Sequence, residues 1–140
     1  MKISTKGRYG LRLMVELGEN WGNGPLSIRE VSRRQEISEK YLEQIILQLS
    51  RAGLVKSIRG AQGGYVLTAP PEEISAGQVL RAVEGSLSPV ECVDDGSECQ
   101  KVDQCVTCEL WRRIKEAVDN VVDSTSIGDL MPHSSSKTDG

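Results

Sequence analysis

Two short helical segments, separated by three residues and followed by a glycine-rich hairpin, constrain the fold of this 140-residue chain most strongly. Ser27 with Glu30 three residues later is the pattern of a capping box, so a helix is predicted to begin there and end near Glu36. Ser38 can cap a second helix, which Gly53 would end. The apolar residues of this second helix recur on one face, namely Leu42, Ile45, Ile46 and Leu49. This order predicts a helix-turn-helix.

The segment after Gly53 is predicted to form a β-hairpin. Residues 54–58 and 65–67 read as short strands, and residues 59–64 between them form a basic tip rich in glycine. A helix-turn-helix followed by a hairpin is the order of a winged helix. Two further helices are expected, one over residues 5–18 and one over residues 75–84, where Ser75 and Gln78 form a second capping-box pattern.

The first of these helices is predicted to be amphipathic. Leu11, Met14 and Val15 would form its apolar stripe, whereas Arg8, Arg12 and Glu16 would lie on other faces.

A longer helix is predicted from Cys108 to about Asp123. Its apolar residues recur every three to four positions, at Leu110, Ile114, Ala117 or Val118, and Val121. A stripe outside the compact domain is best buried against a second copy in a symmetric dimer, although packing back on its own domain is the alternative.

The expected fold class is therefore mainly α with a small β-hairpin. A winged helix-turn-helix would occupy residues 1–85, a cysteine-rich cluster-binding loop residues 86–107, and a dimerisation helix with a return segment residues 108–131. Residues 132–140 are polar and are expected to be a disordered tail. No apolar stretch approaches the roughly 20 residues that span a bilayer, and the N-terminus lacks a secretory signal, so no membrane partner and a cytoplasmic location are expected.

The charge distribution indicates which half of the chain could approach nucleic acid. The net charge is −3, but residues 1–67 carry eleven Lys or Arg against six Asp or Glu, a net +5, and residues 68–140 carry a net −8. Only the N-terminal half has the sign needed to approach a polyanion.

Candidate DNA contacts follow from this fold. The second helix of a helix-turn-helix places its N-terminal residues in the major groove. Arg59, beside glycines that let the backbone approach, suits a narrow minor groove. Basic residues near the N-terminus could hold phosphates, and a dimer would require an inverted-repeat operator in double-stranded DNA. The predicted contact residues are Lys2, Lys6, Arg8, Ser38, Glu39, Lys40, Tyr41, Glu43, Gln44, Arg59, Gly60, Gly63 and Gly64.

All four cysteines lie within one short segment, at Cys92, Cys99, Cys105 and Cys108. In a reducing compartment such a cluster indicates metal binding or redox chemistry rather than structural disulfides. Four thiolates suit a 2Fe-2S cluster, a 4Fe-4S cluster or zinc, and sulfur coordination alone does not separate these. Cys105 and Cys108 could instead form a thiol-disulfide switch, or the cysteines could be vestigial.

Three stretches carry a resemblance to a known family. The opening KISTKGRYGLRLM, the segment ISEKYLEQIILQLSRAGLVKSIRGAQGGYVL and the cysteines before LWRRI resemble the IscR-type family of winged-helix repressors, over nearly the whole chain to Met131. The resemblance implies a homodimer on palindromic promoter sites, with the hairpin as wing, the long helix as dimer interface and DNA contacts at residues 38–44 and Arg59. It also favours a 2Fe-2S cluster, whose family ligands are three cysteines and a fourth residue of the same loop.

This chain differs from the cluster-binding pattern in two ways. One extra residue separates the first two cysteines, and Cys108 stands where the cluster regulator has a histidine. The stretch SLSPVE is closer to the cysteine-metabolism repressors of the family, which act without a cluster through a sulfur-metabolism enzyme partner. The resemblance thus leaves two modes of regulation open.

An enzyme is not expected. The Cys105-x-x-Cys108 pair does not follow a βαβ pattern, the only histidine, His133, lies in the tail, and no nucleophile and base occur together. The sequence predicts a transcriptional regulator, most simply a repressor, whose operator binding responds to the cysteine site.

Overall fold

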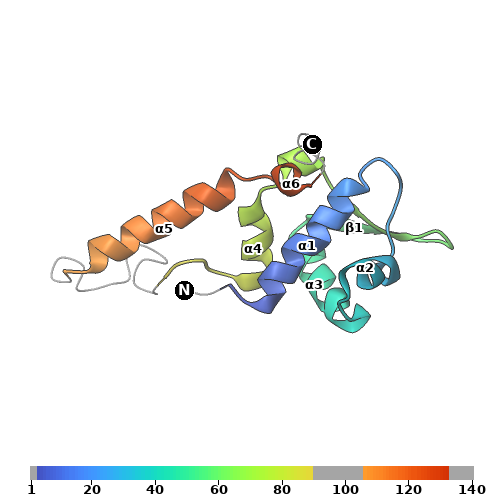
Figure 1. Ribbon diagram of the computed structural model, residues 1–140, viewed down its shortest axis with the longest axis horizontal. Helices are drawn as coiled ribbons and strands as arrows, with labels where there is room; N and C mark the ends of the chain where they lie inside the picture. Colours follow the sequence, from blue (N-terminus) through green and yellow to red (C-terminus); the bar gives the residue numbers. More distant parts are fainter. Residues whose placement is uncertain (1–2, 90–105, 133–140) are drawn as a thin grey trace.

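The structure, a computed structural model, describes residues 3–89 and 106–132. It is mainly helical with one two-stranded antiparallel sheet, which confirms the predicted fold class (Figure 1). Within the described ranges, no helix combines the length and apolarity needed to cross a membrane. The elements in chain order are α1 (Thr5–Glu19), α2 (Ile28–Gln35), α3 (Glu39–Arg51), β1 (Val55–Ile58), β2 (Gly64–Leu67), η1 (Pro71–Glu73), α4 (Ala76–Glu84), α5 (Cys108–Asp123) and α6 (Ile127–Leu130).

Helix α1 is the centre of the hydrophobic core. It contacts α2, α3, α4, α6 and β2, and Leu13, Met14 and Leu17 on it are buried. The predicted stripe was therefore only partly right, because Leu11 and Val15 are half-buried at the edge of the core while Leu13 and Leu17 lie inside it. Elements pack around α1 from several sides, so its apolar arc is wider than one amphipathic stripe.

The predicted helix-turn-helix is confirmed. The Ser27 hydroxyl accepts the Glu30 backbone N–H at 3.1 Å at the start of α2, and the Ser38 hydroxyl accepts the Tyr41 N–H at 3.1 Å at the start of α3. Residues 36–38 form the turn, which Glu36 enters with a left-handed φ of 58°. The predicted apolar face of α3 is fully inside the core, at Leu42, Ile45, Ile46 and Leu49.

The hairpin has the predicted strands and an attachment that the sequence did not reveal. Register runs from Val55 opposite Leu67 to Ile58 opposite Gly64. Leu26, just before α2, forms a β-bridge with Tyr65, through backbone hydrogen bonds of 3.0 and 2.9 Å. This bridge ties the hairpin to the start of the helix-turn-helix.

Helix α4 joins α5 to the rest of the domain. As predicted, Ser75 and Gln78 form a reciprocal capping box at its start. Arg81 on α4 forms ion pairs with Asp119 at 2.8 Å and Asp123 at 2.6 Å on the last turns of α5. From this attachment α5 extends away from the body (Figure 1).

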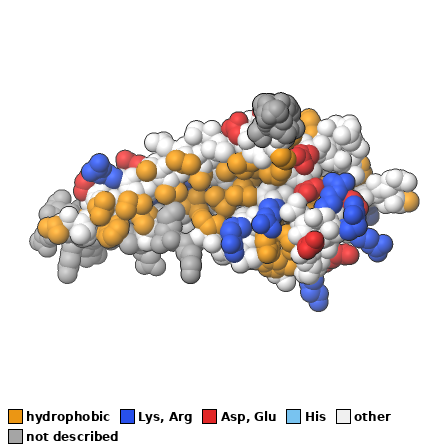
Figure 2. Space-filling model, in the orientation of Figure 1, with side chains coloured by type: hydrophobic (Ala, Val, Ile, Leu, Met, Phe, Trp, Pro, Cys, Tyr) orange, Lys and Arg blue, Asp and Glu red, His pale blue; other side chains and the backbone are white. Residues whose placement is uncertain are grey.

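The apolar stripe of α5 is not covered by its own domain within the described residues. Leu110 is 49% exposed and Val121 is 64% exposed, while Ile114 and Val118 are half-buried. In Figure 2, hydrophobic side chains run along α5 toward the body. The contact with α4 through Arg81 therefore leaves this stripe available.

We expect Gly64→Ala to destabilise the domain. A Cβ at residue 64 would lie 2.4 Å from the Leu26 carbonyl oxygen, so the bridge beside Tyr65 would have to open. Urea unfolding should show a loss of about 1–3 kcal/mol, the usual cost of overpacking. Gly10→Ala is the matched control, because its Cβ would meet Val83 and Ile45 at ordinary distances of 3.6–3.7 Å. Alanine there should stabilise α1 by up to about 1 kcal/mol, and equal losses at both positions would contradict the assigned role of Gly64.

Candidate nucleic-acid interface

The outer face of α3 carries the residues predicted to contact bases. Ser38, Lys40, Glu43 and Gln44 are exposed, whereas Tyr41 is half-buried and packs against the core. The burial of the opposite face fixes this orientation, because α3 cannot rotate without exposing its apolar residues. Ser38, Lys40, Glu43 and Gln44 thus form one exposed polar surface at the N-terminal end of α3, while Leu42 between them points into the core.

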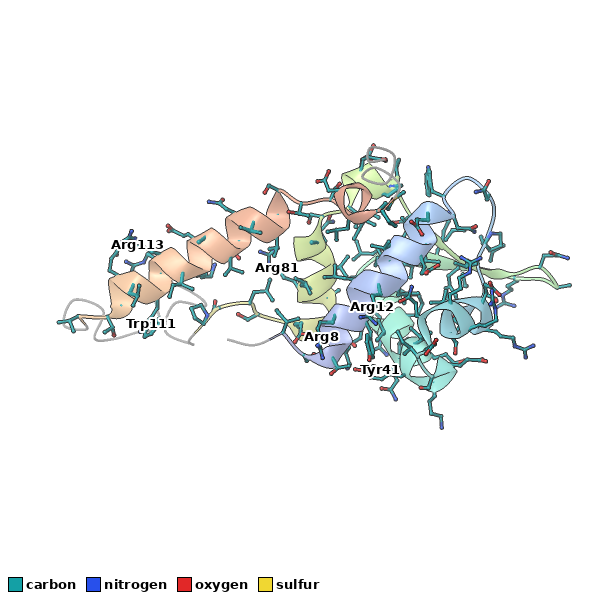
Figure 3. All side chains as sticks on the ribbon, viewed as in Figure 1. Arg8, Arg12, Tyr41, Arg81, Trp111 and Arg113 are labelled. Carbon is teal, nitrogen blue, oxygen red and sulfur yellow. The ribbon has the colours of Figure 1, made fainter. Side chains whose placement is uncertain are left out.

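Helix α1 places arginines beside this surface. The Tyr9 and Tyr41 rings meet edge to face, with centroids 5.8 Å apart, and the Arg12 guanidinium lies 5.3 Å from the Tyr9 ring centroid. Figure 3 shows Arg8 and Arg12 on the side of α1 that faces Tyr41. The two tyrosines thereby join α1 to the first turn of α3.

Arg12 is a candidate contact that the sequence reasoning missed. The sequence placed it outside the apolar stripe of the first helix. Its contact with Tyr9 is local, three residues away on α1, but the contact of Tyr9 with Tyr41 of α3 depends on how the two helices pack. The sequence does hold one indication of this role: Arg12 follows Arg8 by one helical turn, so the two arginines lie on the same side of the helix. Of the predicted N-terminal contacts, Arg8 is exposed, Lys6 is half-buried, and Lys2 lies outside the described residues.

Helix α2 carries arginines that are already paired. Glu30 accepts hydrogen bonds from Arg33 and, at 2.8 Å, from Arg34. These bonds, with that from Arg33 the largest cause, lower the pKa of Glu30 to about 2. The carboxylate that was expected to complete the capping box at Ser27 is therefore committed to the arginines.

Glu16, which the sequence placed outside the apolar stripe of α1, is buried in the structure. It is only 9% exposed and accepts hydrogen bonds from Arg34 at 3.0 Å and from the Gln35 amide at 2.5 Å. A carboxylate in such a place is tolerated because both of its oxygens have partners. Glu16 thus fixes the end of α2, immediately before the turn into α3.

The hairpin tip presents Arg59 and Gly60 to solvent. Its glycines have reasons within the hairpin itself: Gly60 has a φ of 118°, and a Cβ on Gly63 would lie 2.3 Å from the Ile58 carbonyl oxygen. Figure 2 shows Lys and Arg side chains gathered on the half of the molecule built from α1, α2 and α3. Contact of Arg59, Gly60, Gly63 and Gly64 with DNA remains a prediction.

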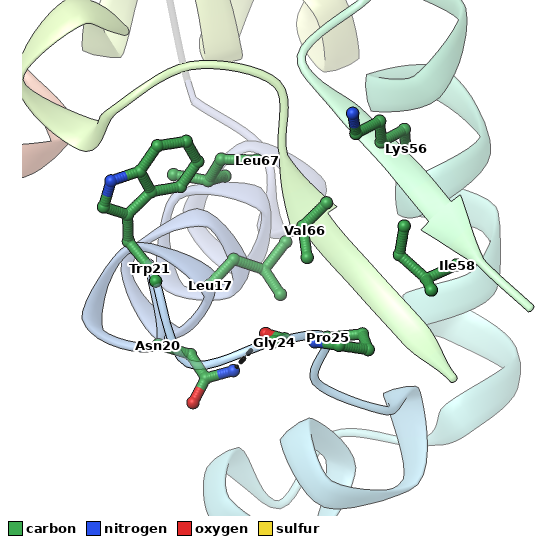
Figure 4. A pocket seen from close by; sticks show the side chains of 10 residues that line it. Leu17, Asn20, Trp21, Gly24, Pro25, Lys56, Ile58, Val66 and Leu67 are labelled. Carbon is green, nitrogen blue, oxygen red and sulfur yellow. Dashed lines mark hydrogen bonds between the residues drawn. The ribbon is translucent and has the colours of Figure 1, made fainter. Parts of the chain in front are cut away.

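An apolar hollow of about 400 Å³ lies between the loop after α1 and the hairpin (Figure 4). Trp21 and Pro25 from the loop, and Ile58 and Val66 from the strands, line it. Lys56 is the one charged residue of its lining. The lining of the hollow therefore contains no pair of titratable groups placed for acid-base catalysis.

Of the predicted cysteine ligands, the structure places Cys108. It is the first residue of α5 and is 2% exposed. Cys92, Cys99 and Cys105 lie outside the described residues. In residues 3–89 and 106–132, no group of three or more His, Cys, Asp or Glu side chains is placed to hold a metal. Convergence of the four thiols stays a prediction.

The helix-turn-helix, the bridged hairpin and the exposed basic surface together define a winged-helix DNA-binding protein. A family model confirms this class: Rrf2, described as an iron-dependent transcriptional regulator, matches residues 3–133. The chain belongs to the Rrf2 family of DNA-binding transcriptional regulators, and it is not an enzyme.

Three relatives illustrate the similarity. The HTH-type transcriptional regulator CymR of Bacillus subtilis (strain 168) is 49% identical over 140 residues, covering 100% of this chain and 94% of CymR. Its solved structure, described as that of the global cysteine regulator, has a TM-score of 0.78 at 48% identity and covers 95% of this chain and 98% of CymR. IscR of Aliivibrio salmonicida (strain LFI1238) is 40% identical over 132 residues, covering 94% of this chain and 77% of IscR. The structure of T. potens IscR has a TM-score of 0.79 at 38% identity, covering 100% of this chain and 93% of that one.

Proposed function

We propose that this Rrf2-family regulator is a repressor that binds an inverted-repeat operator as a homodimer. Helix α3 enters the major groove and the hairpin tip enters the adjacent minor groove. The observation that carries this proposal is the exposed polar surface at the start of α3, with Arg8 and Arg12 beside it. Base readout and phosphate contacts are thereby available on one continuous face.

The residues of the proposed DNA-binding face have different roles, some in base recognition and others in phosphate contact. Gln44 can pair bidentately with adenine, and Glu43 can accept a hydrogen bond from the cytosine amino group. Lys40 and Arg8 can neutralise phosphates, which adds affinity without sequence information. Arg59 extends the contact from the hairpin into the minor groove.

We expect Gln44→Ala and Arg8→Ala to weaken DNA binding in different ways. Loss of Gln44 should reduce discrimination between the operator and a base-substituted operator by about 1–3 kcal/mol, because a base contact is removed. Loss of Arg8 should weaken all duplexes alike and lower the slope of log K against log salt by about one. Fluorescence anisotropy over a salt series measures both quantities. Identical effects of the two substitutions would contradict the assigned division.

The partner proposed for the stripe on α5 is a second copy of the chain. Its exposed members Leu110 and Val121 lie on the helix that extends from the body, so two such helices can pack without disturbing either core. A symmetric dimer buries the same patch on both copies and presents two α3 helices about one DNA turn apart. This arrangement would match an inverted repeat.

We expect Val121→Glu to dissociate the dimer. A carboxylate on the stripe would be buried without a partner, so the dissociation constant should rise at least about tenfold. Asn120→Glu adds the same charge at an exposed neighbouring position outside the stripe and should leave the dimer intact. Sedimentation equilibrium measures both, and equal behaviour of the two variants would contradict a dimer built on this face.

The first proposal for the cysteine site is an iron-sulfur cluster that controls operator binding. Cys92, Cys99, Cys105 and Cys108 would hold a 2Fe-2S cluster, with a 4Fe-4S cluster as the alternative cluster; zinc on the same thiolates belongs to the second proposal. When bound, a cluster supplies an iron centre that responds to oxidation and reduction. The burial of Cys108 supports a ligand shielded from solvent.

A second proposal is a cluster-free thiol or zinc regulator of cysteine metabolism that acts through a sulfur-metabolism enzyme as partner. The 49% identity to CymR, whose solved structure is described as that of a global cysteine regulator, favours this alternative. Under it, the same DNA-binding face is used, and the signal reaches it through a protein contact.

An absorption spectrum of anaerobically purified protein separates the two proposals. With a cluster, the protein should be coloured, contain iron and sulfide in equal amounts, and lose both in Cys108→Ala. A colourless protein without iron would overturn the cluster, and quantified zinc would then distinguish a zinc site from free thiols. Operator binding should persist in the colourless case, because the α3 face does not depend on the cysteines.

A further inference from the structure

The carboxylate of Glu84, the last residue of α4, lies over the first turn of α1. Its Oε2 accepts two hydrogen bonds from Ser4, one from the backbone N–H and one from the hydroxyl, both at 2.7 Å. Ser4 is the N-cap of α1, and its hydroxyl oxygen accepts the Gly7 N–H at 3.4 Å. A Cβ on Gly7 would lie 2.2 Å from Glu84 Oε2, so glycine makes room for the carboxylate.

This contact determines where α1 begins. The Arg8 N–H donates to the Ser4 carbonyl at 3.1 Å, so Ser4 makes the first backbone hydrogen bond of the helix as well as its cap. The turn that Ser4 begins carries Lys6 and Arg8, and Tyr9 follows against Tyr41 of α3. Glu84 therefore fixes, from a position 80 residues away, the end of α1 that supplies the basic side chains.

The charge of Glu84 has the wrong sign for contact with DNA. A carboxylate close to an approaching phosphate lowers affinity, although the positive end of the α1 dipole partly compensates it. Its two charge-assisted hydrogen bonds with Ser4 point instead to a structural role at the start of α1.

We propose that Glu84 is a positioning residue for DNA binding, which holds the first turn of α1 so that Arg8 and Lys6 meet the phosphates beside the α3 site. The inference rests on the proposed function, in which this face binds operator DNA. Glu84 itself does not touch DNA; it acts through Ser4.

Two substitutions separate geometry from charge. In Glu84→Gln the amide oxygen can still accept both bonds, so the helix start is kept and the negative charge is lost. In Glu84→Ala the hydrogen bonds to Ser4 and the negative charge are both lost. We expect Glu84→Ala to weaken operator binding roughly tenfold, the effect of a lost charge-assisted hydrogen bond, and to lower the salt slope by about one. Glu84→Gln should bind as tightly as the wild type or tighter, with an unchanged slope.

Controls come from the same chain. Glu73→Ala removes an exposed carboxylate of η1, a segment that packs near the opposite end of α1, and should change neither affinity nor slope. Ser4→Ala should reproduce part of the Glu84→Ala loss, and the loss in the double variant should be smaller than the sum of the two single losses, because the two residues share one contact. Ser4→Ala also provides the test if Glu84→Ala does not fold.

The outcomes are distinct. If Glu84→Gln and Glu84→Ala raised the affinity for operator DNA equally, only the charge of Glu84 would matter. If neither variant changed the affinity, Glu84 would have no role in DNA binding. Either result would overturn the inference. A wild type that does not prefer an inverted repeat over random duplex would instead overturn the proposed function, whatever the Glu84 variants do.

Discussion

The apolar contact between α1 and α3 is the constraint on which the proposed DNA-binding face depends. The inner residues of α3, among them Leu42, Ile45 and Leu49, are fully buried, and α1 contributes Leu13 and Met14 to the same core. An α-helix packed along one face must present the opposite face outward, so the polar residues of α3 are exposed as a direct consequence of this burial. A core substitution in this contact would therefore change the orientation of the proposed DNA-binding face as well as the stability of the domain.

Polar contacts between segments distant in sequence complete the geometry. Glu16 holds the end of α2 through Arg34 and Gln35, and the backbone bridge between Leu26 and Tyr65 holds the hairpin to the start of the same helix. Helix α2 is thus held at both ends: its start is linked to the hairpin, and its end is linked to α1. The proposed DNA-binding surface is assembled from α1, α3 and the hairpin. Short helices alone are only marginally stable, so links of this kind are needed to keep a constant distance between α3 and the hairpin tip.

Local signals in the sequence predicted most of the fold, and long-range contacts account for what they missed. Caps at Ser27, Ser38 and Ser75 act within three residues, so the starts of α2, α3 and α4 were predictable. The burial of Glu16 and the contact of Tyr9 with Tyr41 of α3 depend on how helices pack, and the periodicity of one segment holds no information about that packing. The exposure of Ser38, Lys40, Glu43 and Gln44 was predictable because their positions in a helix-turn-helix place them on the outer face of its second helix, and their contact with DNA stays a prediction. For the cysteines, the residue type indicates thiolate ligands, but it does not identify the metal or cluster that they would bind.

Helix α4 connects the helix of the proposed dimer interface to the proposed DNA-binding face. Arg81 binds α5 through Asp119 and Asp123, and Glu84, one turn later, binds Ser4 at the start of α1. In Figure 3, Arg81 lies where α4 meets α5, and α1 runs beside α4 on its other side. Because one helical turn separates these two contacts, the direction of α5 and the start of α1 are coupled through a short rigid element. If α5 forms the dimer, this coupling relates the dimer interface to the basic end of each α1, and hence to the distance between the two DNA half-sites that one dimer can bind.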